Sequence, residues 1–271
     1  MLSWVDGRPA EVLSVRDRGL AYGDGLFETI AVSAGRPRLL ARHLARLEEG
    51  LRRLRLAVSL ELVEQELLSF SAGLGSGVLK LMLTRGEGLR GYAPPAEAKV
   101  SRILIGSPTP AYPPANAEQG IALFPCATRL AEQPLLAGLK HLNRLEQVLA
   151  RGEWDDPAYA EGLMRDHSGR VIEGVFSNLF LVRDGRLLTP ELSRCGVAGV
   201  MRAELLAWAT AQGIATEVRD IGYDELLQAD EVFLCNSLYG VWPVRRLQAH
   251  TWPVGAITRK LQSHFGELLD S

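Results

Sequence analysis

Lys140 is the residue whose surroundings in the sequence most favour covalent chemistry. Only four of the 30 basic residues are lysines, and Lys140 follows the apolar residues Leu136 and Leu139. A lysine amine in apolar surroundings loses hydration of its charged form, so its pKa falls and it becomes nucleophilic. Such an amine can form a Schiff base with a carbonyl compound. Position alone favours the alternative, an exposed lysine at a helix start. The other lysines have less distinctive settings: Lys80 in an alternating strand, Lys99 in a polar loop, and Lys260 on the polar face of the last predicted helix.

Glu173 is a carboxylate in an apolar setting. It lies between Ile172 and Val175, in a segment that leads into an apolar strand. An isolated buried charge is costly, so a carboxylate there must be paired or hydrogen-bonded. The pyridine nitrogen of pyridoxal phosphate is one such partner, because a carboxylate keeps it protonated and makes the ring an electron sink. The alternative is an exposed hairpin glutamate, with Ser177 and Asn178 as turn formers.

Two further segments contain groups that suit a phosphate. Gly199 stands immediately before a predicted helix, where backbone N–H groups and the helix dipole favour an anion. Arg46, in the first long helix, lies beside a leucine face from which a guanidinium can reach inward and bind a phosphate through two nitrogens. The alternatives are a packing glycine and a solvated arginine. The glycine-rich segment from Gly73 to Gly77 follows a predicted helix and precedes a predicted strand. A dinucleotide-binding motif has the reverse order, so we do not assign this segment to a dinucleotide.

The loop from Gly86 to Tyr92 is a candidate substrate loop. Its sequence, GEGLRGY, has the glycines of a mobile segment, and Arg90 is a cation suited to a substrate carboxylate. A flexible surface hairpin is the equally favoured alternative.

The elements that must position these residues begin with strands and helices in the N-terminal half. We expect a hairpin turn at Asp6-Gly7 and a strand at Leu26–Val32, because the latter is rich in β-formers. Apolar residues spaced by three and four, all leucines in the first case, predict helices over 40–54 and 60–74. Strands follow at 78–84 and 103–105.

The segment Ser107 to Glu118 carries four prolines and no helical or strand period, which is typical of an interdomain linker. We therefore predict an α+β protein with a smaller N-terminal domain over 1–106, a linker over 107–119 and a larger C-terminal domain over 120–271. The predicted elements of the larger domain are a strand near 121, a helix at 142–150, a hairpin over 177–188, a helix at 200–212, a strand at 232–235 and a helix at 257–268.

Composition excludes several classes of protein. The net charge of −2 gives no field favouring nucleic acid or an anionic membrane. The first residues reach Asp6 without an apolar signal segment, and no apolar run approaches a membrane span. Three cysteines without CxxC spacing suit a reducing cytoplasm and argue against disulfides and structural zinc. The histidines offer no metal-ligand spacing, so we expect no metal, and a metal hydrolase is the least favoured enzyme.

Each signal is weak alone, but in order they resemble the fold-type IV pyridoxal phosphate enzymes along nearly the whole chain. That family contains branched-chain aminotransferases, D-amino acid aminotransferases and aminodeoxychorismate lyases, and residues 139–147 (LKHLNRLEQ) look most like the lyases. The motifs are GDGLFET at 23–29, His43-x-x-Arg46-Leu47, Lys140, Glu173 with Ser177-Asn178, Gly199-Val200-Met201-Arg202, and Asn236-Ser237 before Trp242-Pro243-Val244. Met201 departs from the threonine of many relatives, which removes a hydroxyl contact to phosphate but leaves the backbone N–H.

The resemblance implies an α+β fold of two domains, like that of D-amino acid aminotransferase, with pyridoxal phosphate between them and a homodimer completing the site. It implies that Lys140 carries the cofactor as a Schiff base and acts as acid and base, and that Glu173 binds the pyridine nitrogen. The implied phosphate ligands are Arg46, the backbone at Gly199, Val200 and Met201, and the side chain of Asn236 or Ser237. The candidate substrate residues are Phe27, Thr29, Arg90 and Tyr92.

The implied activity is the lyase reaction that converts 4-amino-4-deoxychorismate to p-aminobenzoate and pyruvate for folate synthesis. A D-amino acid or branched-chain aminotransferase is the first alternative, since it uses the same cofactor and lysine. The second is a non-catalytic binding protein, which retention of both Lys140 and Glu173 disfavours.

Overall fold

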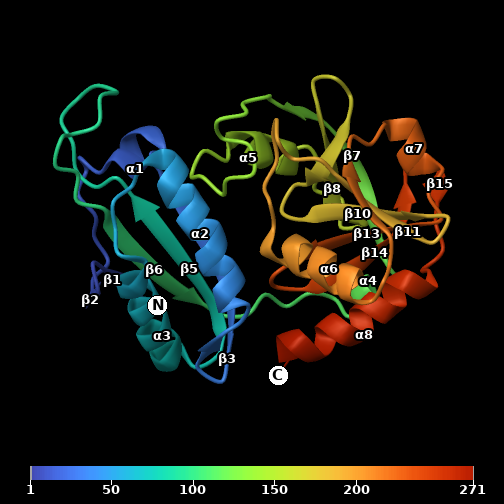
Figure 1. Ribbon diagram of the computed structural model, residues 1–271, viewed down its shortest axis with the longest axis horizontal. Helices are drawn as coiled ribbons and strands as arrows, with labels where there is room; N and C mark the ends of the chain where they lie inside the picture. The colour runs from blue at the N-terminus through green and yellow to red at the C-terminus, as the bar shows by residue number, and fades with distance from the viewer. Residues whose placement is uncertain (1, 271) are drawn as a thin grey trace. The chain divides into compact units, whose positions relative to one another are not determined.

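The computed structural model describes residues 2–270, and the chain forms two compact units (Figure 1). Unit 1 comprises Met1–Pro110 together with Leu139–Asn143. Unit 2 comprises Ala111–Gly138 and Arg144–Ser271. The boundaries expected from the sequence, 1–106, 107–119 and 120–271, stay predictions. The short segment with Lys140 packs with unit 1, although its neighbours on both sides belong to unit 2.

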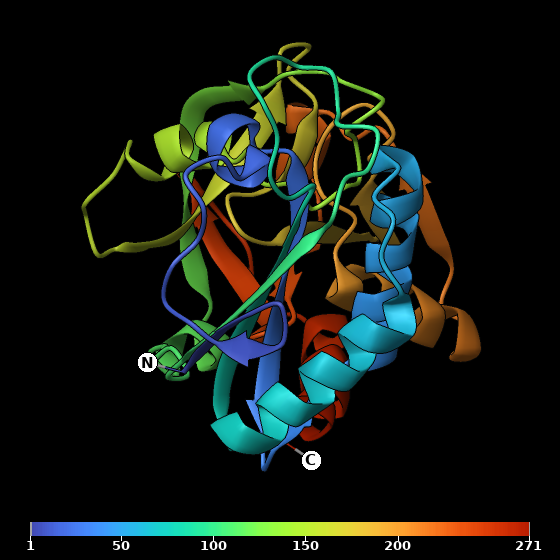
Figure 2. The same ribbon diagram turned by 90° about the vertical axis from the view of Figure 1, so that its left-hand side faces the viewer.

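Unit 1 is built on an antiparallel sheet in the order β2-β1-β6-β5-β3-β4. Two amphipathic helices, α2 and α3, lie side by side against one face of this sheet (Figure 2). The elements of unit 1 are β1 (Ser3–Val5), β2 (Arg8–Pro9), α1 (Arg18–Tyr22), β3 (Gly25–Ser33), β4 (Arg36–Pro37), α2 (Leu40–Leu54), α3 (Leu60–Leu74), β5 (Gly77–Thr84) and β6 (Ser101–Ser107).

The core of unit 1 follows from alternation along β3. Leu26 and Ile30 face inward and pack with Leu47 of α2 and Leu67 of α3 in one buried cluster. Phe27 and Thr29, one residue out of phase, are half-buried on the opposite face, as the two-residue period of a strand requires. The strand therefore carries one face for the core and one for other contacts.

Unit 2 is built on a mixed sheet in the order β12-β11-β10-β13-β14-β7-β8-β9, with β15 on β14. Because β9 pairs with both β8 and β10, the strands from β10 to β9 close into a barrel. The elements of unit 2 are α4 (Ala115–Glu118), β7 (Ile121–Leu130), α5 (Leu145–Arg151), β8 (Tyr159–Asp166), β9 (Val171–Gly174), β10 (Asn178–Arg183), β11 (Arg186–Pro190), α6 (Val200–Ala211), β12 (Thr216–Arg219), α7 (Tyr223–Leu227), β13 (Glu231–Asn236), β14 (Gly240–Leu247), β15 (His250–Thr251) and α8 (Ala256–Asp270).

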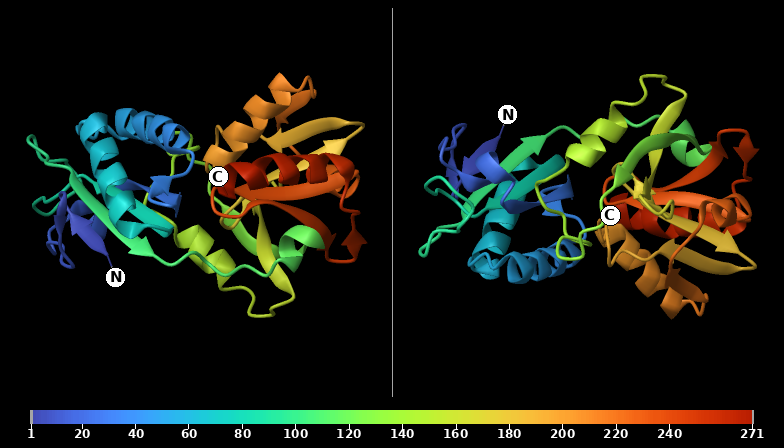
Figure 3. Two further views of the ribbon diagram at one scale, coloured as in Figure 1. Left: turned by 90° about the horizontal axis from the view of Figure 1, so that it is seen from below. Right: turned by 90° about the horizontal axis from the view of Figure 1, so that it is seen from above.

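Helices α6 and α8 pack on strands β13 and β14 of this sheet (Figure 3). The main core of unit 2 contains Leu123, Leu179 and Leu234 from three strands, together with Trp242. A second buried cluster, with Met164 and Ile172, lies along β8 and β9. The short strand β9, which carries Glu173, is thus held on an apolar layer.

Most predicted elements of unit 1 are confirmed. Helices α2 and α3 have the predicted bounds, and the Asp6-Gly7 turn joins β1 to β2 with positive φ at both residues. Two expectations for the rest of the chain are wrong. The helix expected from Leu142 begins at Leu145, because Leu142 donates its backbone N–H to Gly25 beside β3. Residues 115–118 of the proline-rich segment form the short helix α4.

Candidate active site

Lys140 lies next to β3 within unit 1. The backbone N–H of Phe27 donates to the Lys140 carbonyl at 2.9 Å, which aligns the lysine with the half-buried face of the strand. The Lys140 Nζ atom stands 4.4 Å from the centre of the Phe27 ring, and the residue is half-buried. Lys80, Lys99 and Lys260 are exposed. Lys140 is therefore the partly shielded lysine of the four, and the fully exposed alternative is excluded.

The inward face of β3 presents a buried carboxylate, Glu28, that the sequence analysis did not single out. Its oxygens accept from Arg46 Nε at 2.8 Å and from His43 Nδ1 at 2.6 Å, and Arg46 Nη2 makes a further ion pair. Burial raises the pKa of Glu28, but the charges of Arg46 and His43 outweigh burial and hold the pKa at about 2. Arg46 thus points inward, as predicted, and its guanidinium is fixed by Glu28.

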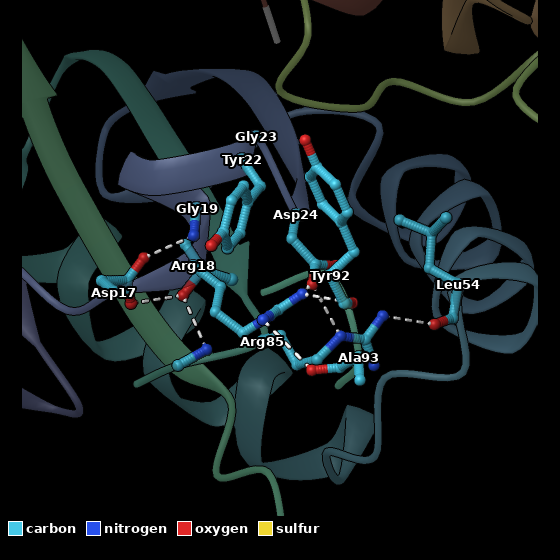
Figure 4. A network of polar contacts seen from close by, with 12 residues as sticks. Asp17, Arg18, Gly19, Tyr22, Gly23, Asp24, Leu54, Arg85, Tyr92 and Ala93 are labelled. Atoms are coloured by element: carbon cyan, nitrogen blue, oxygen red, sulfur yellow. Dashed lines mark hydrogen bonds and ion pairs between the residues drawn. The ribbon is translucent and has the colours of Figure 1, made fainter. Parts of the chain in front are cut away.

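The candidate substrate loop is tied to helix α1 through Arg18 (Figure 4). The buried guanidinium of Arg18 donates to the carbonyls of Gly91 and Tyr92, both at 3.0 Å, while its Nε donates to Asp24 at 2.9 Å. Asp24 also accepts from Arg85 at 2.8 Å. The backbone near Tyr92 is therefore anchored, whereas the side chains of Arg90 and Tyr92 are exposed.

Glu173 occupies a buried position in unit 2, with 4% of its surface exposed. One of its carboxylate oxygens accepts the backbone N–H of Val197 at 2.8 Å. Asn178, opposite Glu173 in the β9–β10 pair, donates from Nδ2 to the Val197 carbonyl at 2.8 Å. The exposed hairpin glutamate is excluded, and both residues hold the segment that leads into α6.

Helix α6 begins in a geometry that suits an anion. Gly199 is the N-cap and offers no side-chain hydrogen bond to the first turn. A Cβ on Gly199 would lie 1.9 Å from Asn178 Oδ1, so the close approach requires glycine. The side chains of Val200 and Met201 are buried, which leaves backbone N–H groups as their means of binding a ligand.

The turn after β13 contains the remaining candidate phosphate ligands. Asn236 Oδ1 accepts the backbone N–H groups of Leu238 at 2.9 Å and Tyr239 at 3.0 Å. Its amide nitrogen donates to the Phe176 carbonyl at 3.4 Å. The Asn236 side chain therefore shapes the turn that presents Ser237, a local role common for asparagine.

A second missed carboxylate, Glu161 on β8, is fully buried in unit 2. Its oxygens accept hydrogen bonds from the Ser177 hydroxyl at 2.7 Å and the backbone N–H of Val175 at 3.0 Å. Burial raises the pKa of Glu161 to about 7, although these hydrogen bonds favour the ionised form. Its sequence context, Tyr159 to Met164, lacks the alternation that marks a strand.

The candidate residues are thus divided between the units. Unit 1 holds Lys140, Phe27, Thr29, Arg46 and the 86–92 loop. Unit 2 holds Glu173, the start of α6 and the turn at 236–237. The described side chains include no group of three or more His, Cys, Asp or Glu able to hold a metal ion. Among the helices within residues 2–270, none is long and apolar enough to cross a membrane.

The chain belongs to the amino-transferase class IV family, whose model matches residues 25–247. Its fold is the α+β, two-domain fold of the fold-type IV enzymes, as the sequence predicted. Pyridoxal phosphate is the cofactor of this family, so the predicted cofactor is confirmed at the level of the family.

Three proteins with similar sequences or structures are two aminodeoxychorismate lyases and one aminotransferase by their descriptions. An aminodeoxychorismate lyase of Vibrio harveyi is 38% identical over 266 residues, covering 96% of this chain and 98% of its own. A crystal structure of 4-amino-4-deoxychorismate lyase from Pseudomonas aeruginosa is 67% identical, with a TM-score of 0.98 and full coverage of both chains. A putative branched-chain-amino-acid aminotransferase of Methanocaldococcus jannaschii is 31% identical over 275 residues, covering 98% of this chain and 93% of its own.

Proposed function

We propose that this chain is a pyridoxal phosphate-dependent lyase that converts 4-amino-4-deoxychorismate to p-aminobenzoate and pyruvate. The observation that carries the proposal is the 67% identity over the full length to a solved 4-amino-4-deoxychorismate lyase. The half-buried Lys140 and the buried Glu173 support it, because they supply the amine and the carboxylate that such chemistry needs.

The residues present fit the cofactor. Glu173 is a buried carboxylate suited to a protonated ring nitrogen, and the uncapped first turn of α6 after Gly199 is suited to a phosphate. Arg46 and the turn presenting Ser237 would supply further phosphate ligands. When bound, the cofactor withdraws electrons from the carbon that carries the substrate nitrogen.

The reaction needs a base and an acid but no water, since the products together contain the atoms of the substrate. The proton leaves the ring carbon bearing nitrogen, the carbon–oxygen bond to the enolpyruvyl group breaks, and the departing enol gains a proton to become pyruvate. We assign both proton transfers to Lys140 Nζ, which lies 4.4 Å from the centre of the Phe27 ring, on a backbone that accepts the Phe27 N–H. Aromatisation of the carbocycle drives the step, so orientation is the main task of the protein.

The first prediction tests this assignment with the substrate itself. Incubation with 4-amino-4-deoxychorismate should give p-aminobenzoate and pyruvate in equal amounts. Lys140→Ala should lower kcat by at least about 10²-fold, the size of a typical general acid–base contribution. Lys99→Ala, at an exposed lysine, is the matched control and should keep wild-type activity. Unequal products, or full activity in Lys140→Ala, would refute the lyase mechanism.

An aminotransferase is the second candidate, favoured by the 31% identity to the Methanocaldococcus jannaschii protein. It would use the same lysine but release a 2-oxo acid from an amino acid. Stoichiometric 2-oxo acid from D-alanine or leucine, with no p-aminobenzoate from the lyase substrate, would favour this candidate over the lyase.

We also propose that the lyase works in the cytoplasm, supplies p-aminobenzoate for folate synthesis and forms a homodimer. The three cysteines are free and buried, which suits a reducing compartment. Helix α5 exposes an apolar face of Leu145, Val148 and Leu149, which suits an interface. Fractionation that places the chain outside the cytoplasm, or a gene deletion without need for p-aminobenzoate, would contradict the first two proposals.

A further inference from the structure

Glu161 is a fully buried carboxylate to which the proposed mechanism gives no role. It lies on β8, and all four of its hydrogen-bonding partners are donors. Three are backbone N–H groups, from Gly162 at 2.9 Å, Val175 at 3.0 Å and Phe176 at 3.3 Å, and the fourth is the Ser177 hydroxyl at 2.7 Å. A carboxylate has about four acceptor sites, so Glu161 is saturated.

Three of those donors belong to one turn, Val175–Ser177, which joins β9 to β10. The turn is closed by a hydrogen bond from the Gly174 N–H to the Ser177 carbonyl at 2.7 Å. A Cβ on Gly174 would lie 2.2 Å from Ser177 Oγ and 2.9 Å from Glu161 Oε2, so the turn packs tightly on the carboxylate. The Val175 N–H also donates to the Gly162 carbonyl of β8 at 3.2 Å, and Glu161 adds to this strand hydrogen bond an acceptor for the Phe176 N–H.

The turn stands between the groups that are proposed to hold the cofactor. Glu173 precedes it, Asn178 follows it, and both bind the backbone of Val197, which leads into α6. Asn236 donates to the Phe176 carbonyl within the turn. A displacement of the turn would thus move the carboxylate for the ring nitrogen and the helix end for the phosphate.

We propose that Glu161 is a positioning residue, which holds the Val175–Ser177 turn so that Glu173 and the start of α6 keep the spacing that pyridoxal phosphate requires. The inference rests on the proposed use of this cofactor. The hydrogen bonds of Glu161 among the described residues go to Gly162 and to the turn, and it acts on the cofactor-binding groups through that turn.

The ionisation of Glu161 provides a readout that a purely structural role would not change. Its pKa is raised by burial to about 7, so its carboxylate form is lost as the pH falls through neutrality. The titratable groups that face it are Tyr112, Cys126 and Tyr239, whose pKa values are all raised by burial and which therefore stay neutral in this range. Protonated Glu161 has lost an acceptor site, and the amide of glutamine imitates that state at every pH.

The second prediction uses Glu161→Gln and the dissociation constant of pyridoxal phosphate, measured by equilibrium dialysis. At pH 8.5 the variant should bind the cofactor about tenfold more weakly, because the amide leaves a buried donor of the turn unpaired. At pH 6 the ratio of the two constants should fall towards one, since the wild-type side chain is then protonated too. Titrations of the cofactor itself cancel in this ratio.

Glu231→Gln is the matched control. Glu231 is also buried and accepts from the backbone N–H of Ile257 at 3.2 Å and of Thr258 at 2.8 Å, but it caps α8. Its variant should lose stability without losing affinity for the cofactor. Ser177→Ala provides a second test if Glu161→Gln does not fold. Loss of the hydroxyl donor should raise the pKa of Glu161 and move the loss of affinity to higher pH.

The outcomes separate the inference from the proposed function. If the wild-type protein does not bind pyridoxal phosphate, both are wrong. If it binds the cofactor and Glu161→Gln binds equally well at pH 8.5, Glu161 does not position the site. Equal weakening by Glu161→Gln and Glu231→Gln, or a ratio that does not change with pH, would reduce Glu161 to a general contributor to stability.

Discussion

At the scale of single residues, three buried glutamates show how the partners of a carboxylate decide its properties. Glu28 is bound by a guanidinium and an imidazole, and its pKa is held at about 2. Glu161 is bound by uncharged donors only, and burial raises its pKa to about 7. Glu173 accepts the backbone N–H of Val197 at 2.8 Å and is the carboxylate proposed to bind a protonated ring nitrogen. Cations therefore create a fixed charge, whereas neutral donors leave a group that titrates near neutrality.

The third prediction concerns the fixed charge of Glu28. Glu28→Gln should lower the free energy of unfolding at pH 7 by about 3 kcal/mol, because it removes the buried carboxylate that pairs with the Arg46 guanidinium and accepts from His43. Urea titration followed by circular dichroism measures this loss. Glu49→Gln is the matched control on α2, since Glu49 pairs with Arg52 at an exposed site, and it should change stability by less than about 0.5 kcal/mol.

The pH dependence of the same variant follows from the lowered pKa. A folded pKa of about 2 against the usual 4.5 means that Glu28 contributes stability above pH 4.5 and loses it as the pH falls towards 2. The difference between the wild type and Glu28→Gln should therefore shrink in acid. A difference that is constant down to pH 2, or losses of equal size in Glu28→Gln and Glu49→Gln, would contradict the ion-pair account.

The sequence identified the candidate residues better when their type is rare than when it is common. Lys140 was found because the chain has few lysines, and Glu173 because it interrupts an apolar run. Glu28 could have been identified from the sequence, since it stands between the inward positions Leu26 and Ile30 and needs a buried partner. Glu161 could not have been identified in this way, because the strand that buries it has no recognisable hydrophobic period.

At the scale of elements, the local sequence pattern predicts those helices whose stability depends mainly on local spacing. The spacing of apolar residues predicts the bounds of α2 and α3, because the stability of these helices comes from one apolar face. The helix predicted over 142–150 includes the segment before α5. Its backbone instead bonds to β3, a pairing more than a hundred residues away along the chain. The conformation at Lys140 therefore depends on a long-range pairing, which the sequence near Lys140 does not reveal.

The candidate substrate loop is also controlled by an element distant in sequence, helix α1. Arg18 donates to the carbonyls of Gly91 and Tyr92, and the Tyr22 hydroxyl accepts the Gly91 N–H at 3.1 Å. Charge-assisted hydrogen bonds to a buried guanidinium are the strong kind. The anchor therefore restricts the backbone that carries Arg90 and Tyr92.

The fourth prediction removes this anchor with Arg18→Met. Amide hydrogen exchange over residues 88–93 should become faster, and KM for 4-amino-4-deoxychorismate should rise by about tenfold if the loop binds substrate. Arg16→Met is the control, because the Arg16 side chain meets the same loop through an exposed ion pair with Glu87 at 3.5 Å, and the variant keeps the hydrogen bond from the Gly88 N–H to the Arg16 carbonyl at 3.1 Å. Faster exchange with an unchanged KM would remove the loop from the substrate site and leave it a surface feature.

At the scale of the whole molecule, the chain divides its candidate site residues between two units with separate cores. It also leaves an apolar surface on unit 2 that neither core explains. Leu145, Val148 and Leu149 of α5 are 75%, 63% and 64% exposed, and their spacing places them on one face of the helix. Isolated exposed leucines are ordinary, and three exposed apolar side chains on one helical face suit an interaction surface.

The fifth prediction is that this face is part of the proposed homodimer interface. Sedimentation equilibrium should give twice the 29.6 kDa of one chain for the wild type, and Leu149→Glu should shift it towards the monomer, because a buried unpaired charge is costly. Leu68→Glu, at one of the two exposed leucines of α3, should remain dimeric. A dimeric Leu149→Glu protein would place the interface elsewhere, whereas a monomeric wild type would show that one chain alone must provide every residue of the active site.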